Sequence, residues 1–151
     1  YWIEYICKRF ENTGKHISPE LAEEICRLVD NHSSYVQQLS WLLWIRTINT
    51  ATTEQLSYAL EDLLDQNNIL FQSETENLSA YQMNFLKAIV DGIHTKFSSK
   101  EVISKYNLGT SANIVRLKNA LLQKELIETN GKEIVLADPV FGVWFKKEML
   151  Y

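Results

Sequence analysis

The chain has 151 residues, of which 23% are charged and 46% apolar, and it carries a net charge of −4. This length suits one domain or two small ones, and the 11% aromatic content with a small net charge excludes a disordered chain. No apolar run reaches the roughly 18 residues of a membrane span, and no basic and apolar leader opens the sequence. Two cysteines are too few for a disulfide framework, so we expect reduced thiols and a cytoplasmic location. The start inside an apolar-periodic stretch, Tyr-Trp-Ile-Glu, is typical of a piece of a longer protein.

The charge is unevenly spread along the chain. Residues 1–79 hold 5 Lys or Arg and 12 Asp or Glu, a net of −7, whereas residues 80–151 hold 10 and 7, a net of +3. Such an asymmetry indicates two modules with different partners. The most polar stretch, residues 72–79, marks the boundary between them. We therefore predict a helical domain over residues 1–77 and a second domain over residues 78–151.

The acidic half has the apolar periodicity of a small helical bundle. Helices are predicted over about 1–12, 19–29, 34–48 and from 53 to at least 64. Ser18-Pro19 opens the second helix, and Thr52-x-x-Gln55 is a capping box for the fourth. The third helix is apolar on nearly all sides, which predicts a central or covered position.

The basic half predicts a winged helix-turn-helix domain. Four local signals follow one another: a capping box at Ser79-x-x-Gln82, a second at Ser98-x-x-Glu101, a tight turn at Asn107-Leu108-Gly109, and a cap at Thr110-Ser111. These signals predict a helix, a short helix, a turn that contains glycine and a third helix, which is the order of a helix-turn-helix motif.

A β-hairpin and a last helix complete this domain. Asn130-Gly131 lies between two strand-forming segments and predicts a hairpin with a type I′ turn, in which both central residues have positive φ. Asp138-Pro139 then opens a C-terminal helix rich in aromatic residues, which we expect to pack onto one of the domains. The predicted fold class is mainly α: a small helical bundle followed by a winged helix-turn-helix domain with one β-hairpin.

No catalytic or metal-binding constellation is visible in the sequence. Neither Gly14-Lys15 nor Gly131-Lys132 fits the phosphate-binding pattern G-x-x-x-x-G-K-[ST]. The histidines, at positions 16, 32 and 94, have no metal-ligand spacing. The carboxylate clusters fall on polar helix faces, where solvated charge is the expected role. We expect no catalytic residue and no metal site in this chain.

The third helix of a winged helix can enter the DNA major groove while the wing contacts the backbone. A helical wheel of residues 110–124 places Arg116, Asn119 and Gln123 on its outward stripe. Arg116 suits guanine, and the two amides suit adenine. Lysines that could contact phosphate are Lys96, Lys100, Lys105 and Lys132. The charge is low for a DNA reader, however, so docking on another protein domain stays open beside DNA binding.

Several segments together resemble the C-terminal part of archaeal-type AAA+/STAND family ATPases. They are the order of the helices, Leu78-Ser79-x-x-Gln82-x-x-Phe85-Leu86, Tyr106-Asn107-Leu108-Gly109-Thr110-Ser111, and Asp138-Pro139-Val140-Phe141-Gly142-Val143-Trp144. In that family a nucleotide-binding domain comes first, followed by a helical lid and a winged helix. The resemblance covers essentially the whole chain.

The resemblance implies a non-catalytic region of a larger ATPase. ATP and magnesium would be held by residues of the parent protein upstream of Tyr1, and the winged helix would bind DNA, the protein's own ATPase domain or another protein. Where the family often has a Gly-x-Pro turn, this chain has Asn31-His32-Ser33-Ser34, and His32 is the candidate for facing nucleotide. The alternative is a self-contained winged-helix transcriptional regulator whose helical half dimerises or binds an effector.

Overall fold

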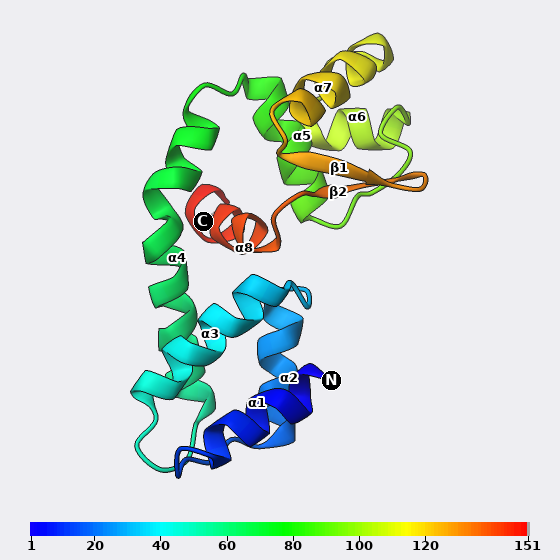
Figure 1. The fold of residues 1–151 in the computed structure, drawn as a ribbon. Coiled ribbons are helices and arrows are strands. Elements are labelled where there is room, and N and C mark those ends of the chain that lie inside the picture. Colours follow the sequence, from blue (N-terminus) through cyan, green and yellow to red (C-terminus); the bar gives the residue numbers. More distant parts are fainter. Residues whose placement is uncertain (151) are drawn as a thin grey trace. The chain divides into compact units, whose positions relative to one another are not determined.

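The computed structural model describes residues 1–150 as eight helices and one two-stranded sheet (Figure 1). The helices are α1 (Trp2–Glu11), α2 (Pro19–Leu28), α3 (Ser33–Arg46), α4 (Thr53–Glu76), α5 (Ala80–Val90), α6 (Lys100–Tyr106), α7 (Ser111–Gln123) and α8 (Pro139–Met149). The strands are β1 (Ile127–Asn130) and β2 (Glu133–Leu136). This confirms the predicted fold class. The chain divides into two compact units, Tyr1–Asn68 and the residues from Ile69 onward, and α4 contributes to both.

Helices α1, α2 and α3 and the first part of α4 form the first unit. Helix α1 packs against both α2 and α3. The loop before α2 is tied to the loop before α4, because the His16 N–H donates to the Asn49 carbonyl and the Ala51 N–H donates to the His16 carbonyl, each at 2.8 Å. The predicted caps are present: Ser18 Oγ accepts from the Leu21 N–H, and Thr52 and Gln55 form both bonds of a capping box.

The sequence predicts that helix α3 is covered on all sides, and the structure shows that it is not. Its buried residues are Val36, Leu39, Leu42 and Leu43. Trp41 and Ile45, in contrast, keep 59% and 49% of their surface exposed. The helix therefore has one buried face and one open apolar face, and the open face adjoins a groove described below.

Both cysteines lie in the first unit and are free thiols. Cys26 is buried, and Cys7 is half-buried with its Sγ 3.7 Å from the Ile17 carbonyl oxygen. Burial raises the pKa of both thiols. The prediction that both cysteines lie in or near the core is confirmed, and their reduced state stays a prediction.

The second unit is built around α5, which packs against α6, α7, α8 and β2. Its core is dominated by buried aromatic side chains, namely Phe71, Phe85, Phe97, Phe141, Trp144 and Phe145. The Phe71 ring centroid lies 5.4 Å from that of Phe141 and 5.6 Å from that of Trp144. The C-terminal helix α8 thus packs onto the end of α4 inside this unit.

The polar stretch that marks the predicted domain boundary at 77/78 is helical as far as Glu76. The compact units divide earlier, after Asn68. The reason is the packing of the last turns of α4, where Phe71 and Thr75 are only 1% and 8% exposed. Buried side chains spaced four residues apart keep this otherwise polar segment helical and join it to the second unit.

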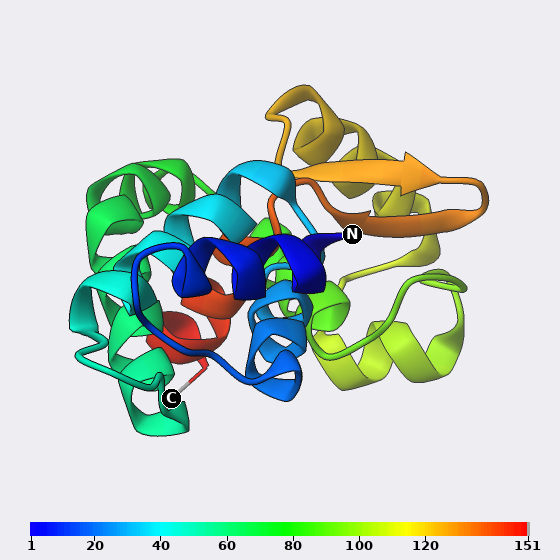
Figure 2. The same ribbon diagram turned by 60° about the horizontal axis from the view of Figure 1, so that its bottom comes forward.

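Strands β1 and β2 form the predicted antiparallel hairpin, with Ile127 paired to Leu136 and Asn130 paired to Glu133. This register makes Gly131 and Lys132 the central residues of the turn, so the predicted Asn130-Gly131 centre is wrong by one position. Gly131 has φ of +65°, which suits the first central position of a type II′ turn. The tip of the hairpin projects beyond the helices of its own unit in both views (Figures 1 and 2).

The helix caps of the second unit follow the sequence with two corrections. Thr110 stands at the N-cap position of α7, but its side chain makes no capping hydrogen bond, so the predicted side-chain cap there is wrong. Ser79 and Gln82 form the predicted capping box of α5. Helix α6 is capped by Ser99, whose Oγ accepts from the Val102 N–H, and the predicted box beginning at Ser98 is wrong. Asp138 caps α8 by accepting from two backbone N–H groups.

Candidate nucleic-acid interface

The turn between α6 and α7 is held in a defined shape by its backbone and by two asparagine side chains. Asn107 has a left-handed backbone with φ of +54°, and Gly109 has φ of +88°. Asn84 Nδ2 donates to the Asn107 carbonyl at 3.1 Å, and Asn113 Nδ2 donates to the Leu108 carbonyl at 3.2 Å. A Cβ on Gly109 would lie 3.2 Å from Asn113 Nδ2, so a side chain here would disturb the bond that links the turn to α7.

Helix α7 has one buried and one exposed face. Ile114, Leu117 and Leu121 are buried against the unit. Arg116, Asn119 and Gln123 are all exposed. Spacings of three and four residues place these side chains on one side of a helix, so α7 presents an arginine and two amides together.

The segment around α7 carries positive charge and no acid. From Val102 to Lys124 there is no Asp or Glu. The cations in this segment are Lys105, Arg116, Lys118 and Lys124. The two ion pairs formed within residues 1–150, Arg27 with Glu24 and Arg46 with Asp62, lie in the other unit. The α7 cations are therefore not neutralised by a described carboxylate.

The other candidate lysines are exposed but not gathered on one surface. Lys100 and Lys105 lie on α6 five positions apart, which corresponds to about 140° around a helix. The Lys105 Nζ is 5.3 Å from the centroid of the Tyr106 ring. The structure thus brings together the three α7 residues, and it does not place the two α6 lysines on one face.

Lys132 occupies the tip of the wing. It is exposed at the second central position of the β1–β2 turn. Two exposed acids, Glu128 and Glu133, lie on the same hairpin. The tip therefore offers one cation to a phosphate, whereas the strands behind it carry negative charge.

His32 lies in the first unit, at the N-cap position of α3, and its side chain makes no capping hydrogen bond. Its exposed ring is 4.8 Å from the ring of Tyr35. Arg46 near the end of the same helix binds Asp62 through two hydrogen bonds of 2.8 and 3.0 Å. The role of His32 toward nucleotide stays a prediction.

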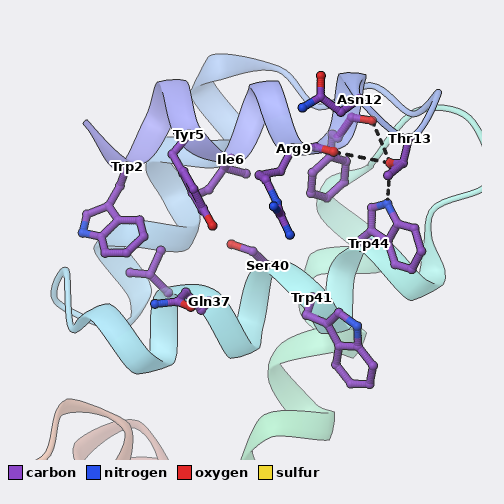
Figure 3. A pocket seen from close by; sticks show the side chains of 12 residues that line it. Trp2, Tyr5, Ile6, Arg9, Asn12, Thr13, Gln37, Ser40, Trp41 and Trp44 are labelled. Atoms are coloured by element: carbon purple, nitrogen blue, oxygen red, sulfur yellow. Dashed lines mark hydrogen bonds between the residues drawn. The ribbon is translucent and has the colours of Figure 1, made fainter.

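The sequence does not reveal a groove of about 560 Å³ between α1 and α3 of the first unit (Figure 3). Its walls include Trp2, Tyr5 and Arg9 from α1 and Trp41 and Trp44 from α3. Spacing gives each wall by itself, because α1 residues three and four apart and α3 residues three apart project from one side of their helices, but it does not show that the two walls face each other. Within the described residues 1–150, no group of three His, Cys, Asp or Glu could hold a metal ion. None of the helices in that range is both long enough and apolar enough to cross a bilayer.

Comparison with known proteins gives one family and one related fold. The family described as "Probable winged helix domain" matches residues 69–147. The solved structure of the Walker-type ATPase PABY2304 of Pyrococcus abyssi is similar, with a TM-score of 0.70 and 19% sequence identity. The similarity covers 96% of this chain and 41% of that chain, so this chain spans less than half of the archaeal protein's length. None of the curated proteins matches this chain significantly.

Proposed function

This chain belongs to the family of probable winged helix domains, and from that premise we propose that its second unit binds duplex DNA through helix α7. The observation that carries the proposal is the exposed face of Arg116, Asn119 and Gln123 in a segment free of acids. An acid on this face would repel the DNA backbone, so its absence over 102–124 favours an anionic partner.

In the proposed complex α7 lies in the major groove. The Arg116 guanidinium donates two hydrogen bonds to a guanine edge, and the amides of Asn119 and Gln123 pair with adenine. Lys132 at the wing tip binds a phosphate and fixes the orientation of the domain without reading sequence. The hydroxyls of Thr110 and Ser111 at the start of α7 are exposed and suit a second phosphate, which the positive end of the helix also favours.

We propose further that the chain is the non-catalytic C-terminal region of a Walker-type ATPase of the AAA+/STAND kind. Two observations support this: the motif order described above, and the similarity of fold to an archaeal Walker-type ATPase over 96% of the chain. ATP and magnesium then belong to another domain of the parent protein. Sequencing the codons before Tyr1 tests the proposal; a G-x-x-x-x-G-K-[ST] segment upstream supports it, and its absence from the preceding few hundred codons contradicts it.

Docking of the winged helix on a protein domain is the second candidate. Val115 lies on α7 next to Arg116 and is 63% exposed, so this face offers an apolar contact as well as a charge. The residues from Ile69 onward also hold ten Lys or Arg against nine Asp or Glu, a small excess for a DNA-binding domain. The parent ATPase domain is the partner that this alternative favours.

Fluorescence anisotropy of the 151-residue chain on a labelled mixed-sequence duplex separates the two candidates. The titration is run at low salt and near physiological salt, with Arg116→Ala, Lys132→Ala and the control Lys147→Ala, an exposed lysine of α8. We expect salt-sensitive binding that Arg116→Ala weakens about 10-fold and Lys132→Ala several-fold, with the salt slope reduced by about 1 for Lys132→Ala. Lys147→Ala leaves affinity nearly unchanged. No binding at low salt, or equal loss in all three variants, contradicts DNA recognition by α7 and favours protein docking.

A further inference from the structure

The groove between α1 and α3 has the size and composition of a small-molecule site. Its volume of about 560 Å³ falls within the range of roughly 300 to 1,000 Å³ that such sites occupy. Every residue that lines it belongs to the first unit, so the groove is formed without the winged helix. Three of the chain's four tryptophans line it: Trp2, Trp41 and Trp44.

The aromatic walls are partly fixed in place. Trp44 is held from two sides, because its Nε1–H donates to Thr13 Oγ1 at 2.8 Å and the Lys15 Nζ lies 3.9 Å from a ring centroid of its indole. The rings of Trp2 and Tyr5 meet edge to face at 5.7 Å on the opposite helix. Rings with fixed positions offer stacking surface to a planar ligand at little cost in side-chain entropy.

A single unpaired cation lies between these walls. The Arg9 side chain extends from α1 toward α3, into the groove (Figure 3), and its guanidinium carbon is 5.8 Å from the Tyr5 ring centroid. Arg27 and Arg46, the other arginines of this unit, are both bound to carboxylates. Arg9 forms no ion pair with any residue from 1 to 150, which leaves its guanidinium available for an anion.

The groove also contains a hydroxyl that lacks a hydrogen-bond partner. Ser40 Oγ on α3 is buried, and within the described residues nothing accepts from it or donates to it. Figure 3 shows it facing α1, with the side chains of Tyr5 and Arg9 above it. Buried hydroxyls are nearly always satisfied in folded proteins, so an orphan of this kind beside a cation indicates a place for a ligand oxygen.

We propose that this groove binds a small planar aromatic molecule that bears a carboxylate. The ring system lies among Trp2, Tyr5 and Trp41, and the carboxylate accepts from the Arg9 guanidinium. When the flexible Arg9 side chain moves to meet the ligand, the Ser40 hydroxyl is uncovered and donates to the second carboxylate oxygen. The site is independent of DNA binding by α7, since it uses no residue of the second unit.

The test uses 2-naphthoate and its uncharged counterpart naphthalene-2-methanol as probes of the 151-residue chain. The indole N–H signals of the four tryptophans are followed by ¹⁵N NMR during each titration. We expect 2-naphthoate to shift the signals of Trp2, Trp41 and Trp44, whereas Trp144, which is buried in the other unit, serves as the internal reference. The alcohol should shift the same signals with weaker affinity, because it lacks the charge.

Three variants decide whether the groove selects the anion. Arg9→Gln should weaken 2-naphthoate about 10-fold and leave the alcohol unchanged, because it removes a charge-assisted hydrogen bond. Lys8→Gln removes the same charge from the neighbouring exposed residue and should change neither affinity. Ser40→Ala should weaken 2-naphthoate a few-fold. No shift with millimolar 2-naphthoate, shifts that include Trp144 equally, or equal losses in Arg9→Gln and Lys8→Gln would each overturn the proposal.

Discussion

The two units differ in how most of their aromatic residues are placed, although Phe10 is buried in the first unit and Tyr81 is 43% exposed in the second. In the second unit Phe85, Phe141 and Trp144 are each at most 1% exposed and form the core. In the first unit Trp41 and Tyr58 keep 59% and 48% of their surfaces open to solvent. All six phenylalanines of the chain are buried, whereas the open rings carry an N–H or O–H that can remain hydrated. Phenylalanine is therefore buried in both units, whereas the exposure of a tryptophan or tyrosine ring depends on its place in the fold, which the total aromatic content does not reveal.

Replacing one tryptophan in each unit gives the largest expected difference. Trp144→Ala leaves a cavity beside Phe71 and Phe141 and should lower the free energy of unfolding by about 3–5 kcal/mol. Trp41→Ala removes an exposed ring and should cost less than about 1 kcal/mol. Urea denaturation followed by far-UV circular dichroism measures both. Equal losses would show that Trp41 is buried in solution and would remove the contrast between the units.

The N-terminal caps of α2 and α8 give an effect of intermediate size. Asp138 Oδ1 accepts from the Val140 and Phe141 N–H groups at 2.9 and 3.1 Å, whereas Ser18 Oγ accepts from Leu21 alone at 3.1 Å. Asp138→Ala should cost about 1–2 kcal/mol and Ser18→Ala about 1 kcal/mol. Asp138→Asn retains a capping oxygen and serves as the control. The comparison fails if Asp138→Asn destabilises the chain as much as Asp138→Ala does, because charge would then outweigh capping.

Glu74 on α4 gives the smallest effect, and its size depends on pH. Burial, and then the charge of Asp138, raise the pKa of the Glu74 carboxyl above its ordinary value. The folded state therefore prefers the protonated acid, and stability is lost as pH rises from the ordinary pKa through the raised one. Glu74→Gln should increase the free energy of unfolding near neutral pH by less than about 1 kcal/mol.

The gain from Glu74→Gln should vanish about one unit below the ordinary carboxylate pKa, where the acid is protonated in both states. Urea titrations at the two pH values measure the change. Glu76→Gln, an exposed neighbour on the same helix, is the control. A gain that persists in acid, or that the control matches, would show that charge burial at Glu74 is not its cause.

Local chemistry made much of the fold predictable from the sequence. The boxes at Thr52-x-x-Gln55 and Ser79-x-x-Gln82 fix helix starts because both halves of each box are present in the chain. At the start of α6 the same pattern is misleading, because only Ser98 has an acid three residues later, whereas the cap is Ser99, whose third residue onward is Val102. The hairpin was predictable, but its centre was not, because Gly131 suits either position of a tight turn.

Features that depend on distant contacts were not predictable. The end of α4 has a polar sequence and stays helical because Phe71 packs on α8, about 70 residues later in the chain. The groove needs two helices to face each other, and periodicity along one helix does not reveal its neighbour. The outward face of α7 could be predicted, because one helix with one buried side determines it.

The two cysteines make the first unit chemically distinguishable from the second. Cys7 and Cys26 are the only thiols in the chain, and burial raises the pKa of both, so few thiolates are available for reaction near neutral pH. Cys7 is half-buried and can react without opening, but alkylation of Cys26, which is only 5% exposed, has to wait for the first unit to open, so Cys26 is the thiol to follow. The rate of iodoacetamide labelling of Cys26 then reports the opening of the first unit alone. Local opening of the second unit, which has no cysteine, produces no labelled residue.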